Sequence, residues 1–306
     1  MQRFVVLIMF SLLSVLFGCK SNPAYQHKDG KFLYKDIEFT VADPGSFKIL
    51  NDVFARDNIQ GYYRGEAIVN SNGKTFEALN ENYAKDNVTV YFCDTYRKGQ
   101  EYYSIKHNLV STIEQADVKT FQVLNNEYAK DKFQVYYKDK PFKVKDASSF
   151  ILLDYGFAKD NISAYYQEAM IDGSDGETFN VLNNHYSADK MNIYYSEMEV
   201  SQEPNIPVKP VTYKIEKALP GSFKVLDDGY AIDANKVYYD GKELTKETAA
   251  FQVLQLGYAK NKSQVYYTGK IISDADANTF TVLDIITDTA DSKDEKYYYQ
   301  QGKKIK

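Results

Sequence analysis

The chain has 306 residues, of which 15% are aromatic, and it carries a formal net charge of −5 at pH 7. Acidic and basic residues are interspersed without a basic block, which argues against nucleic acid as a partner. The length allows one large domain or two domains of medium size.

The first residues are typical of an export signal. Arg3 precedes an apolar run from Phe4 to Phe17, which is shorter than the ~20 residues that a membrane-spanning helix needs. The segment Leu16-Phe17-Gly18-Cys19 resembles a bacterial lipobox. This resemblance implies cleavage before Cys19 and acyl chains on its side chain, which would attach the mature protein to a membrane of the bacterial cell envelope. The alternative is a plain secretory signal in which Cys19 is incidental.

One phenylalanine recurs through the rest of the chain at intervals of about 29 residues, with two longer gaps. A fixed period in this range is typical of a repeat architecture. The residues of this series are Phe47, Phe76, Phe121, Phe150, Phe179, Phe223, Phe251 and Phe280. A partial copy precedes the series, because Leu33-Tyr34 lie at the usual distance before Phe47.

Other residues recur at fixed distances after this phenylalanine. Leucine follows three residues later in all eight copies. Aspartate or asparagine follows ten residues later, as Asp57, Asp86, Asp131, Asp160, Asp189, Asp233 and Asn261. An aromatic pair follows five residues after that, as Tyr62-Tyr63, Tyr91-Phe92, Tyr136-Tyr137, Tyr165-Tyr166, Tyr194-Tyr195, Tyr238-Tyr239 and Tyr266-Tyr267. Most of the 28 tyrosines therefore belong to the architecture of the repeat.

The segments "AKDKFQVYY" (Ala129–Tyr137) and "ANKVYYDGK" (Ala234–Lys242) resemble the repeats of the DKNYY family. The resemblance extends over roughly residues 30–302. Repeats of that family occur in exported bacterial proteins, often lipoproteins, and the function of the family is not established. The resemblance implies no catalytic or binding residues.

Each repeat is expected to form three short strands separated by polar turns. The strands are the Phe-x-Val-Leu run, the aromatic-Ala-Lys run and the Val-Tyr-Tyr run. A unit of this size cannot bury its own apolar face and must stack on its neighbours. We therefore predict an all-β protein whose tandem repeats form a curved β-array or solenoid. Closure like that of a β-propeller is the alternative.

The two long gaps divide the chain into groups of repeats. After a signal peptide at 1–18 and a tether at 19–30, we expect a partial repeat with repeats 1–2 at 31–92, and an insert and turn at 93–120. Repeats 3–5 follow at 121–195, a second insert at 196–222 and repeats 6–8 at 223–306. The second insert contains Pro204, Pro207 and Pro210, so we expect it to resist strand structure and to act as a stiff linker.

The recurrence of the same residues favours a non-catalytic interaction module or scaffold, whose partner would be an envelope protein or glycan. Adjacent side chains on a strand face opposite ways, so we expect one tyrosine of each pair to face solvent. The uninterrupted block of repeats 3–5 then offers candidate binding residues at Tyr136, Tyr137, Tyr165, Tyr166, Tyr194 and Tyr195. Alternatively, the outward tyrosines only stiffen the sheets.

An enzyme with a cryptic site at the inserts is the alternative function, because residues that do not repeat gather there. Its candidate residues are Cys93, Tyr102, Tyr103 and His107. The competing interpretation of Cys93 is a small buried apolar residue at a strand end. The chain contains no complete zinc, calcium or nucleotide-binding pattern, so we expect no metal and no cofactor.

Overall fold

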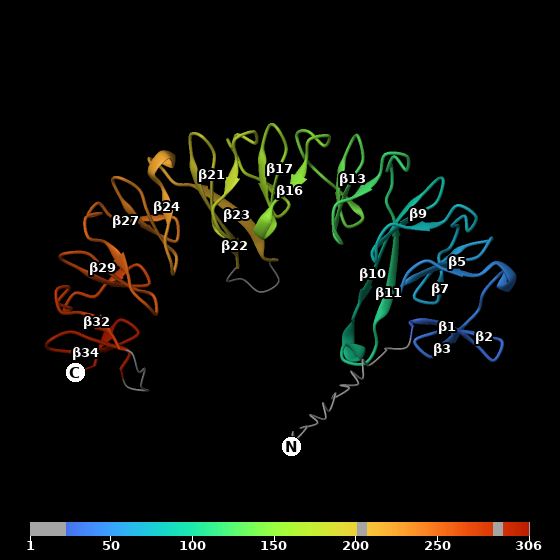
Figure 1. Cartoon of the computed structure of the whole chain (residues 1–306), viewed down its shortest axis with the longest axis horizontal. Helices are drawn as coiled ribbons and strands as arrows, with labels where there is room; N and C mark the ends of the chain where they lie inside the picture. The colour runs from blue at the N-terminus through green and yellow to red at the C-terminus, as the bar shows by residue number, and fades with distance from the viewer. Residues whose placement is uncertain (1–22, 201–206, 284–289, 306) are drawn as a thin grey trace, which may run out of the picture. The chain divides into compact units, whose positions relative to one another are not determined.

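A computed structural model of the protein describes residues 23–200, 207–283 and 290–305 (Figure 1). These residues form short β-strands and four single 3-10 turns, at Pro44–Ser46, Gly99–Glu101, Asp154–Gly156 and Pro220–Ser222. Within these ranges no helix is long and apolar enough to cross a membrane. The chain divides into two compact units, Met1–Thr112 and Ile113–Lys306.

The first unit contains three antiparallel sheets in its described part. The first sheet consists of β1 (Tyr25–Lys28), β2 (Lys31–Tyr34) and β3 (Ile37–Phe39). The second consists of β4 (Lys48–Ile49), β5 (Phe54–Arg56), β6 (Gly61–Tyr63) and β7 (Glu66–Ala67). The third consists of β8 (Glu77–Ala78), β9 (Tyr83–Lys85), β10 (Val90–Tyr96) and β11 (His107–Thr112).

The second unit contains six four-stranded sheets among its described residues. Repeats 3 and 4 form β12 (Gln122–Val123), β13 (Tyr128–Lys130), β14 (Val135–Tyr137) and β15 (Lys140–Phe142), then β16 (Ile151–Leu152), β17 (Phe157–Lys159), β18 (Ala164–Tyr166) and β19 (Ala169–Met170). Repeats 5 and 6 form β20 (Asn180–Val181), β21 (Tyr186–Ala188), β22 (Ile193–Glu199) and β23 (Lys209–Lys214), then β24 (Lys224–Val225), β25 (Tyr230–Ile232), β26 (Val237–Tyr239) and β27 (Lys242–Thr245). Repeats 7 and 8 form β28 (Gln252–Val253), β29 (Tyr258–Lys260), β30 (Val265–Tyr267) and β31 (Lys270–Ile271), then β32 (Thr281–Val282), β33 (Ser292–Lys293), β34 (Tyr298–Gln300) and β35 (Lys303–Lys304).

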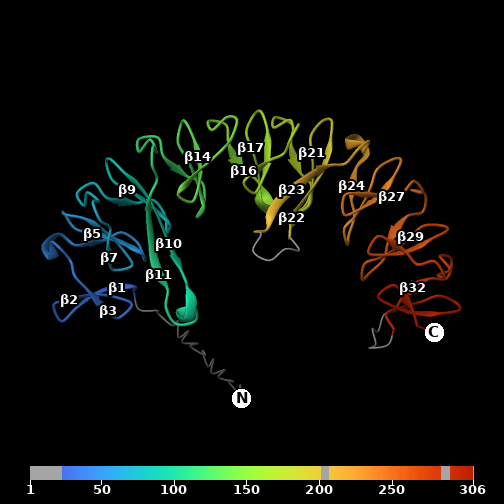
Figure 2. The ribbon, with the colours of Figure 1, turned by 180° about the vertical axis from the view of Figure 1, so that it is seen from behind.

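Every repeat is a meander in which each strand pairs with the next strand along the chain. Within each unit the successive sheets lie side by side in chain order (Figures 1 and 2). The all-β array of tandem repeats is thus confirmed, as are the three strands expected in each repeat. The sequence did not predict the fourth strand. The fourth strand follows the Val-Tyr-Tyr strand after a two-residue turn such as Thr268-Gly269, in which φ is 42° at Thr268 and 71° at Gly269. Positive φ at both positions matches the right-handed twist of the paired strands.

The two inserts lengthen existing strands into hairpins and are not linkers. In the first hairpin, β10 and β11 pair from Tyr91↔Thr112 to Tyr96↔His107. In the second hairpin, β22 and β23 pair from Tyr194↔Lys214 to Glu199↔Lys209. The expected stiff linker at 196–222 is therefore wrong. Pro210 lies on β23 and pairs with Met198 of β22. β23 is at the edge of the sheet, where a residue without an N–H is tolerated.

The expected tether at 19–30 is shorter than predicted, because β1 begins at Tyr25. The Tyr25 side chain is 2% exposed. Its hydroxyl donates a hydrogen bond to the Val53 carbonyl oxygen at 3.0 Å and accepts one from the Gly65 N–H at 3.1 Å. Residues that precede the first recognisable repeat are therefore already part of the first sheet and its contact with the second.

The hydrophobic core lies between successive sheets. Tyr165 packs in a cluster with Phe150 of its own repeat and Val135 of the preceding repeat. Its neighbour Tyr166 packs in the next cluster with Phe157 and Phe179. Both faces of β18 are thus covered, because its sheet has a neighbour on each side.

Candidate functional site

Seven of the eight four-stranded repeats are organised around a buried aspartate that accepts a hydrogen bond from the tyrosine five residues later. The hydroxyl-to-carboxylate distance is between 2.6 and 2.8 Å in every such pair. The Asp–Tyr pairs are Asp57–Tyr62, Asp86–Tyr91, Asp131–Tyr136, Asp160–Tyr165, Asp189–Tyr194, Asp233–Tyr238 and Asp294–Tyr299. We predicted these aspartates as turn residues, and the sequence did not show that they are buried.

The Asp160–Tyr165 pair shows how much one carboxylate holds together. Asp160 Oδ1 accepts the backbone N–H groups of Ile162 at 2.8 Å and Ser163 at 2.7 Å, which fixes the turn between β17 and β18. Its Oδ2 accepts the Tyr165 hydroxyl at 2.6 Å and the N–H of Asp146 at 2.9 Å. The carboxylate therefore joins the turn that opens the repeat to its second and third strands.

Burial by itself would raise the pKa of these carboxyls. The hydrogen bonds to the ionised form outweigh burial, so the pKa of Asp57, Asp86, Asp160, Asp189 and Asp233 lies below the ordinary value. The same balance lowers the pKa of Asp294 to about 2. The tyrosine partners shift the other way, because burial and the adjacent carboxylate raise the pKa of Tyr62 and Tyr165. At neutral pH the pairs made by these six aspartates thus consist of a carboxylate and a neutral phenol.

The seventh repeat replaces the aspartate with Asn261 and rearranges the hydrogen bonds accordingly. Asn261 Oδ1 still accepts two backbone N–H groups, from Ser263 at 2.9 Å and Gln264 at 2.8 Å. Its Nδ2 donates to the Tyr266 hydroxyl at 3.2 Å, and this hydroxyl donates in turn to Gln264 Oε1 at 2.6 Å. The turn that follows this residue therefore needs a side-chain oxygen as hydrogen-bond acceptor. The hydrogen bond with the tyrosine does not need a charged side chain.

The second tyrosine of the aromatic pair packs against the following repeat, as Tyr195 and Tyr239 show. A Cβ placed on Gly241 would lie 2.6 Å from the Tyr195 side chain, and one on Gly269 would lie 2.3 Å from the Tyr239 side chain. Both glycines also have positive φ, at 73° and 71°. Glycine is therefore required twice over in these turns, by backbone conformation and by close approach of the tyrosine ring.

A third tyrosine position bridges successive repeats through its hydroxyl. Tyr230 donates to the Gly257 carbonyl oxygen and accepts from the Gly269 N–H, both at 3.1 Å. Tyr258 makes the same kind of bridge to Asp291 and Gly302, at 2.7 Å each. Burial raises the pKa of Tyr258 to about 12, and the hydrogen bonds with Ser292 and the Gly302 N–H oppose it in part.

The six tyrosines predicted as binding residues lie in these interfaces between sheets. Tyr136, Tyr165, Tyr166, Tyr194 and Tyr195 are buried, and Tyr137 is half-buried against Tyr128 with ring centres 4.9 Å apart. The expectation that one member of each pair faces solvent is wrong. Side chains do alternate along the strand, but both faces of the strand are covered. Cys19, the predicted lipidation site, lies outside the described residues.

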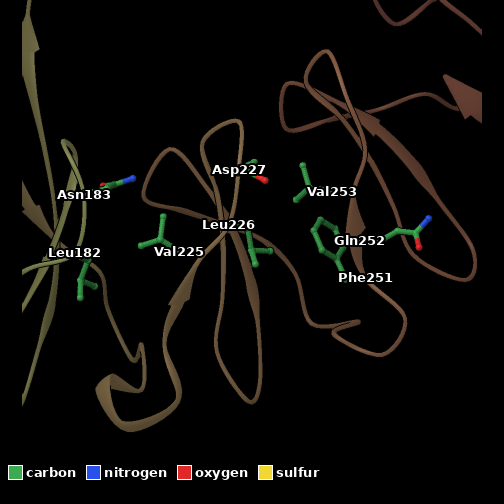
Figure 3. Close-up of a pocket in the computed structure, with 8 residues that line it drawn as sticks. All are labelled: Leu182, Asn183, Val225, Leu226, Asp227, Phe251, Gln252 and Val253. Atoms are coloured by element: carbon green, nitrogen blue, oxygen red, sulfur yellow. The ribbon is translucent and has the colours of Figure 1, made fainter. Parts of the chain in front are cut away.

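Solvent-accessible grooves instead follow the first strands of successive repeats. The larger groove has a volume of about 620 Å³ and runs across repeats 5, 6 and 7 (Figure 3). Its lining consists of Leu182, Asn183, Val225, Leu226, Asp227, Phe251, Gln252 and Val253. A second groove of about 470 Å³ uses matching positions of repeats 4 and 5, with Leu152, Leu153, Asp154, Phe179 and Val181 in its lining. We call these two together the repeat grooves.

The first hairpin carries a group of exposed apolar and aromatic side chains. Tyr103 is 93% exposed and Tyr102 is 53% exposed, and their rings meet edge to face with centres 5.3 Å apart. Tyr96 and Leu109 on the strands and Ile105 just before β11 are also exposed. The second hairpin exposes Met198, Val200, Val208 and Tyr213. These extensions are the places where the chain departs from its repeat.

The geometry does not assemble the nucleophilic site considered for the first insert. Cys93 is buried among Tyr63, Phe76 and Tyr91, and burial raises the pKa of its thiol well above the ordinary range. On the paired strand Cys93 faces Val110, whereas His107 faces Tyr96. Cys93 is thus a small buried apolar residue, as the competing interpretation predicted. Among the residues with described positions, no three His, Cys, Asp or Glu side chains are placed to hold a metal ion.

The fold and the recurrent Asp–Tyr pairs define a tandem β-repeat protein. The family model "DKNYY family" matches residues 15–95, 139–198 and 243–303, well over half of the chain. The chain therefore belongs to the DKNYY family. No curated protein and no solved structure matches it. In structural terms, the aspartate and first tyrosine of the motif form the pair inside one repeat, and the second tyrosine contacts the next repeat.

Proposed function

We propose that this protein is a lipid-anchored protein of the bacterial cell envelope that acts as a non-catalytic interaction scaffold. The observation that supports the proposal is the recurrence of the repeat grooves. Two grooves use the same positions of successive repeats, from the recurrent phenylalanine itself to four residues after it. A site repeated along an array suits an elongated partner, which would contact several repeats at once.

The lining indicates what such a partner offers. Val225, Val253 and Leu226 are half-buried and present apolar surface, while Asp227 and Asn183 present polar groups at the rim of the same groove. Alternating apolar and polar contacts suit an extended polypeptide or a glycan, both of which carry hydrogen-bond donors at regular intervals. The lipobox-like segment that ends at Cys19 supports attachment of this scaffold to a membrane.

Site-specific photo-crosslinking in the native envelope tests the proposal. A crosslinking side chain at Leu182, inside the larger groove, is expected to form a discrete adduct, and one at Met191 is not. Met191 is a matched control because it belongs to the same repeat, is 69% exposed and lies outside the groove. Adducts that are absent at Leu182, or equal at both positions, would contradict the scaffold. In the same experiment Cys19→Ala is expected to move the protein out of the membrane fraction, and retention there would contradict the lipid anchor.

A further inference from the structure

We propose that the tip of the first hairpin, residues 96–107, docks on an anionic phospholipid bilayer. The proposal concerns a surface separate from the repeat grooves and does not depend on a lipid at Cys19. It rests on the exposure of aromatic side chains at the tip and on a local charge opposite to that of the whole chain.

The aromatic part of the tip is unusually exposed for a folded protein. Tyr103 has 93% of its surface in contact with solvent, and Tyr102 and Ile105 are exposed beside it. The strands β10 and β11 pair only as far as Tyr96↔His107. The two tyrosine rings lie beyond the paired strands and are not buried against them. Tyrosine is enriched where one end of a side chain contacts hydrocarbon and the other contacts water, which is the situation at a membrane surface.

The charged part of the tip complements an anionic surface. In the sequence Arg97 and Lys98 precede the two tyrosines and Lys106 follows them, with Glu101 as the one acidic residue between these basic residues. Lys98 and Lys106 make no ion pair with any described residue, and the Glu101 carboxylate lies 3.0 Å from His107 Nε2. The protein as a whole carries a net charge of −5, so this basic tip is a local reversal of sign.

The magnitude of the expected effect follows from the basic residues. Each Lys or Arg near an anionic membrane contributes about 1 kcal/mol, or about fivefold in association. Three such residues therefore favour an anionic bilayer over a neutral one by about a hundredfold. A flexible Lys or Arg side chain can keep its charge at the headgroups while the rings enter the interface.

The absence of tryptophan from the sequence permits a direct test on the full-length protein. Tyr103→Trp places a single fluorescent reporter at the tip, and Val200→Trp places one on the second hairpin, where Val200 is 73% exposed. With vesicles that contain phosphatidylglycerol, we expect the Tyr103→Trp emission to shift to the blue and to be quenched by brominated acyl chains. Neither change is expected for Val200→Trp.

Charge reversal at the tip distinguishes bilayer binding by this surface from attachment of the protein through a lipid anchor. In the Tyr103→Trp chain, the added changes Arg97→Glu, Lys98→Glu and Lys106→Glu should abolish the shift, while an unchanged thermal melt shows that the fold is intact. The proposal is overturned by an absent shift on anionic vesicles, by an equal shift on pure phosphatidylcholine, or by an equal shift of the Val200→Trp reporter. A lost groove adduct with an intact tip response, or the reverse, distinguishes failure of the scaffold proposal from failure of this one.

Discussion

The Asp–Tyr pairs are nearly identical from one repeat to the next, whereas the two hairpins differ from each other in their side chains. The pairs use the same residues at the same spacing in seven sheets, and their geometry varies by only 0.2 Å between the shortest and longest hydrogen bond. The hairpins share a pairing pattern but not a chemistry. Residues 96–108 contain three basic residues and one acidic residue, whereas residues 197–212 contain three acidic residues and one basic residue. The recurrent Asp–Tyr pairs therefore stabilise the fold, whereas the differences in charge are found in the two hairpins, which are not part of the repeat.

Acid is expected to produce the largest effect, because it acts on many pairs at once and spares the hairpins. The pKa of six of the paired carboxyls lies below the ordinary Asp value, at about 2 for Asp294. The unfolded chain therefore binds protons at a higher pH than the folded one does. The contribution of the pairs is complete above the ordinary pKa of about 3.9 and is lost as the pH falls toward the folded values. Thermal melts should show a steadily falling Tm from pH 5 to pH 2, and a constant Tm over this range would contradict the role assigned to the pairs.

Removal of one pair is expected to have the next largest effect. Asp160→Ala leaves the N–H groups of Ile162 and Ser163 and the Tyr165 hydroxyl without their acceptor, at a cost of about 4 kcal/mol in the free energy of unfolding. Asp172→Ala is the matched control, since Asp172 is an exposed carboxylate of the same repeat, and should change stability by less than about 0.5 kcal/mol. Urea unfolding followed by circular dichroism measures both. Equal losses in the two variants would show that charge, and not the pair, is responsible.

Shortening a hairpin is expected to have the smallest effect on stability. Thr95 pairs with Asn108, so residues 96–107 can be replaced by an Asn-Gly turn that suits a two-residue hairpin. The removed side chains are largely exposed, and the change in unfolding free energy should stay below about 1 kcal/mol. A larger loss in the same urea experiment would mean that the hairpin is part of the repeat core, and the contrast between the two regions would disappear.

Much of the repeat could be predicted from the sequence because its strands carry a strong local signal. The Phe-x-Val-Leu, aromatic-Ala-Lys and Val-Tyr-Tyr runs are apolar and β-branched, and each became a strand. The fourth strand has no such signal. At Lys270–Ile271 it is two exposed residues long, and its existence follows from the turn that precedes it. The constant spacing between the aspartate and the first tyrosine was the sign that could have identified the pairs.

The candidate site was predicted less well, for a reason that lies in the packing between repeats. Alternation along a strand determines that Tyr194 and Tyr195 face opposite ways, but it does not determine what covers each face. Tyr194 packs with Phe179 of its own repeat, and Tyr195 packs with residues of the following repeat. The grooves were missed because they form between first strands of different repeats, from residues that look like ordinary core in each repeat alone. The proline-rich insert was misjudged because a proline on an edge strand costs no ladder hydrogen bond.

The local pairing of every sheet has a consequence for how the chain folds. All strand pairs in the described residues join neighbours in the sequence, so each sheet is completed by one contiguous stretch of chain. Loop closure is then inexpensive in entropy, and proteins with such short-range contacts fold fast for their size. A repeat can form as soon as its own stretch is available, before the residues that follow it. Within each unit the array is thus suited to grow in order from its N-terminal end, with each finished sheet providing the surface on which the next one packs.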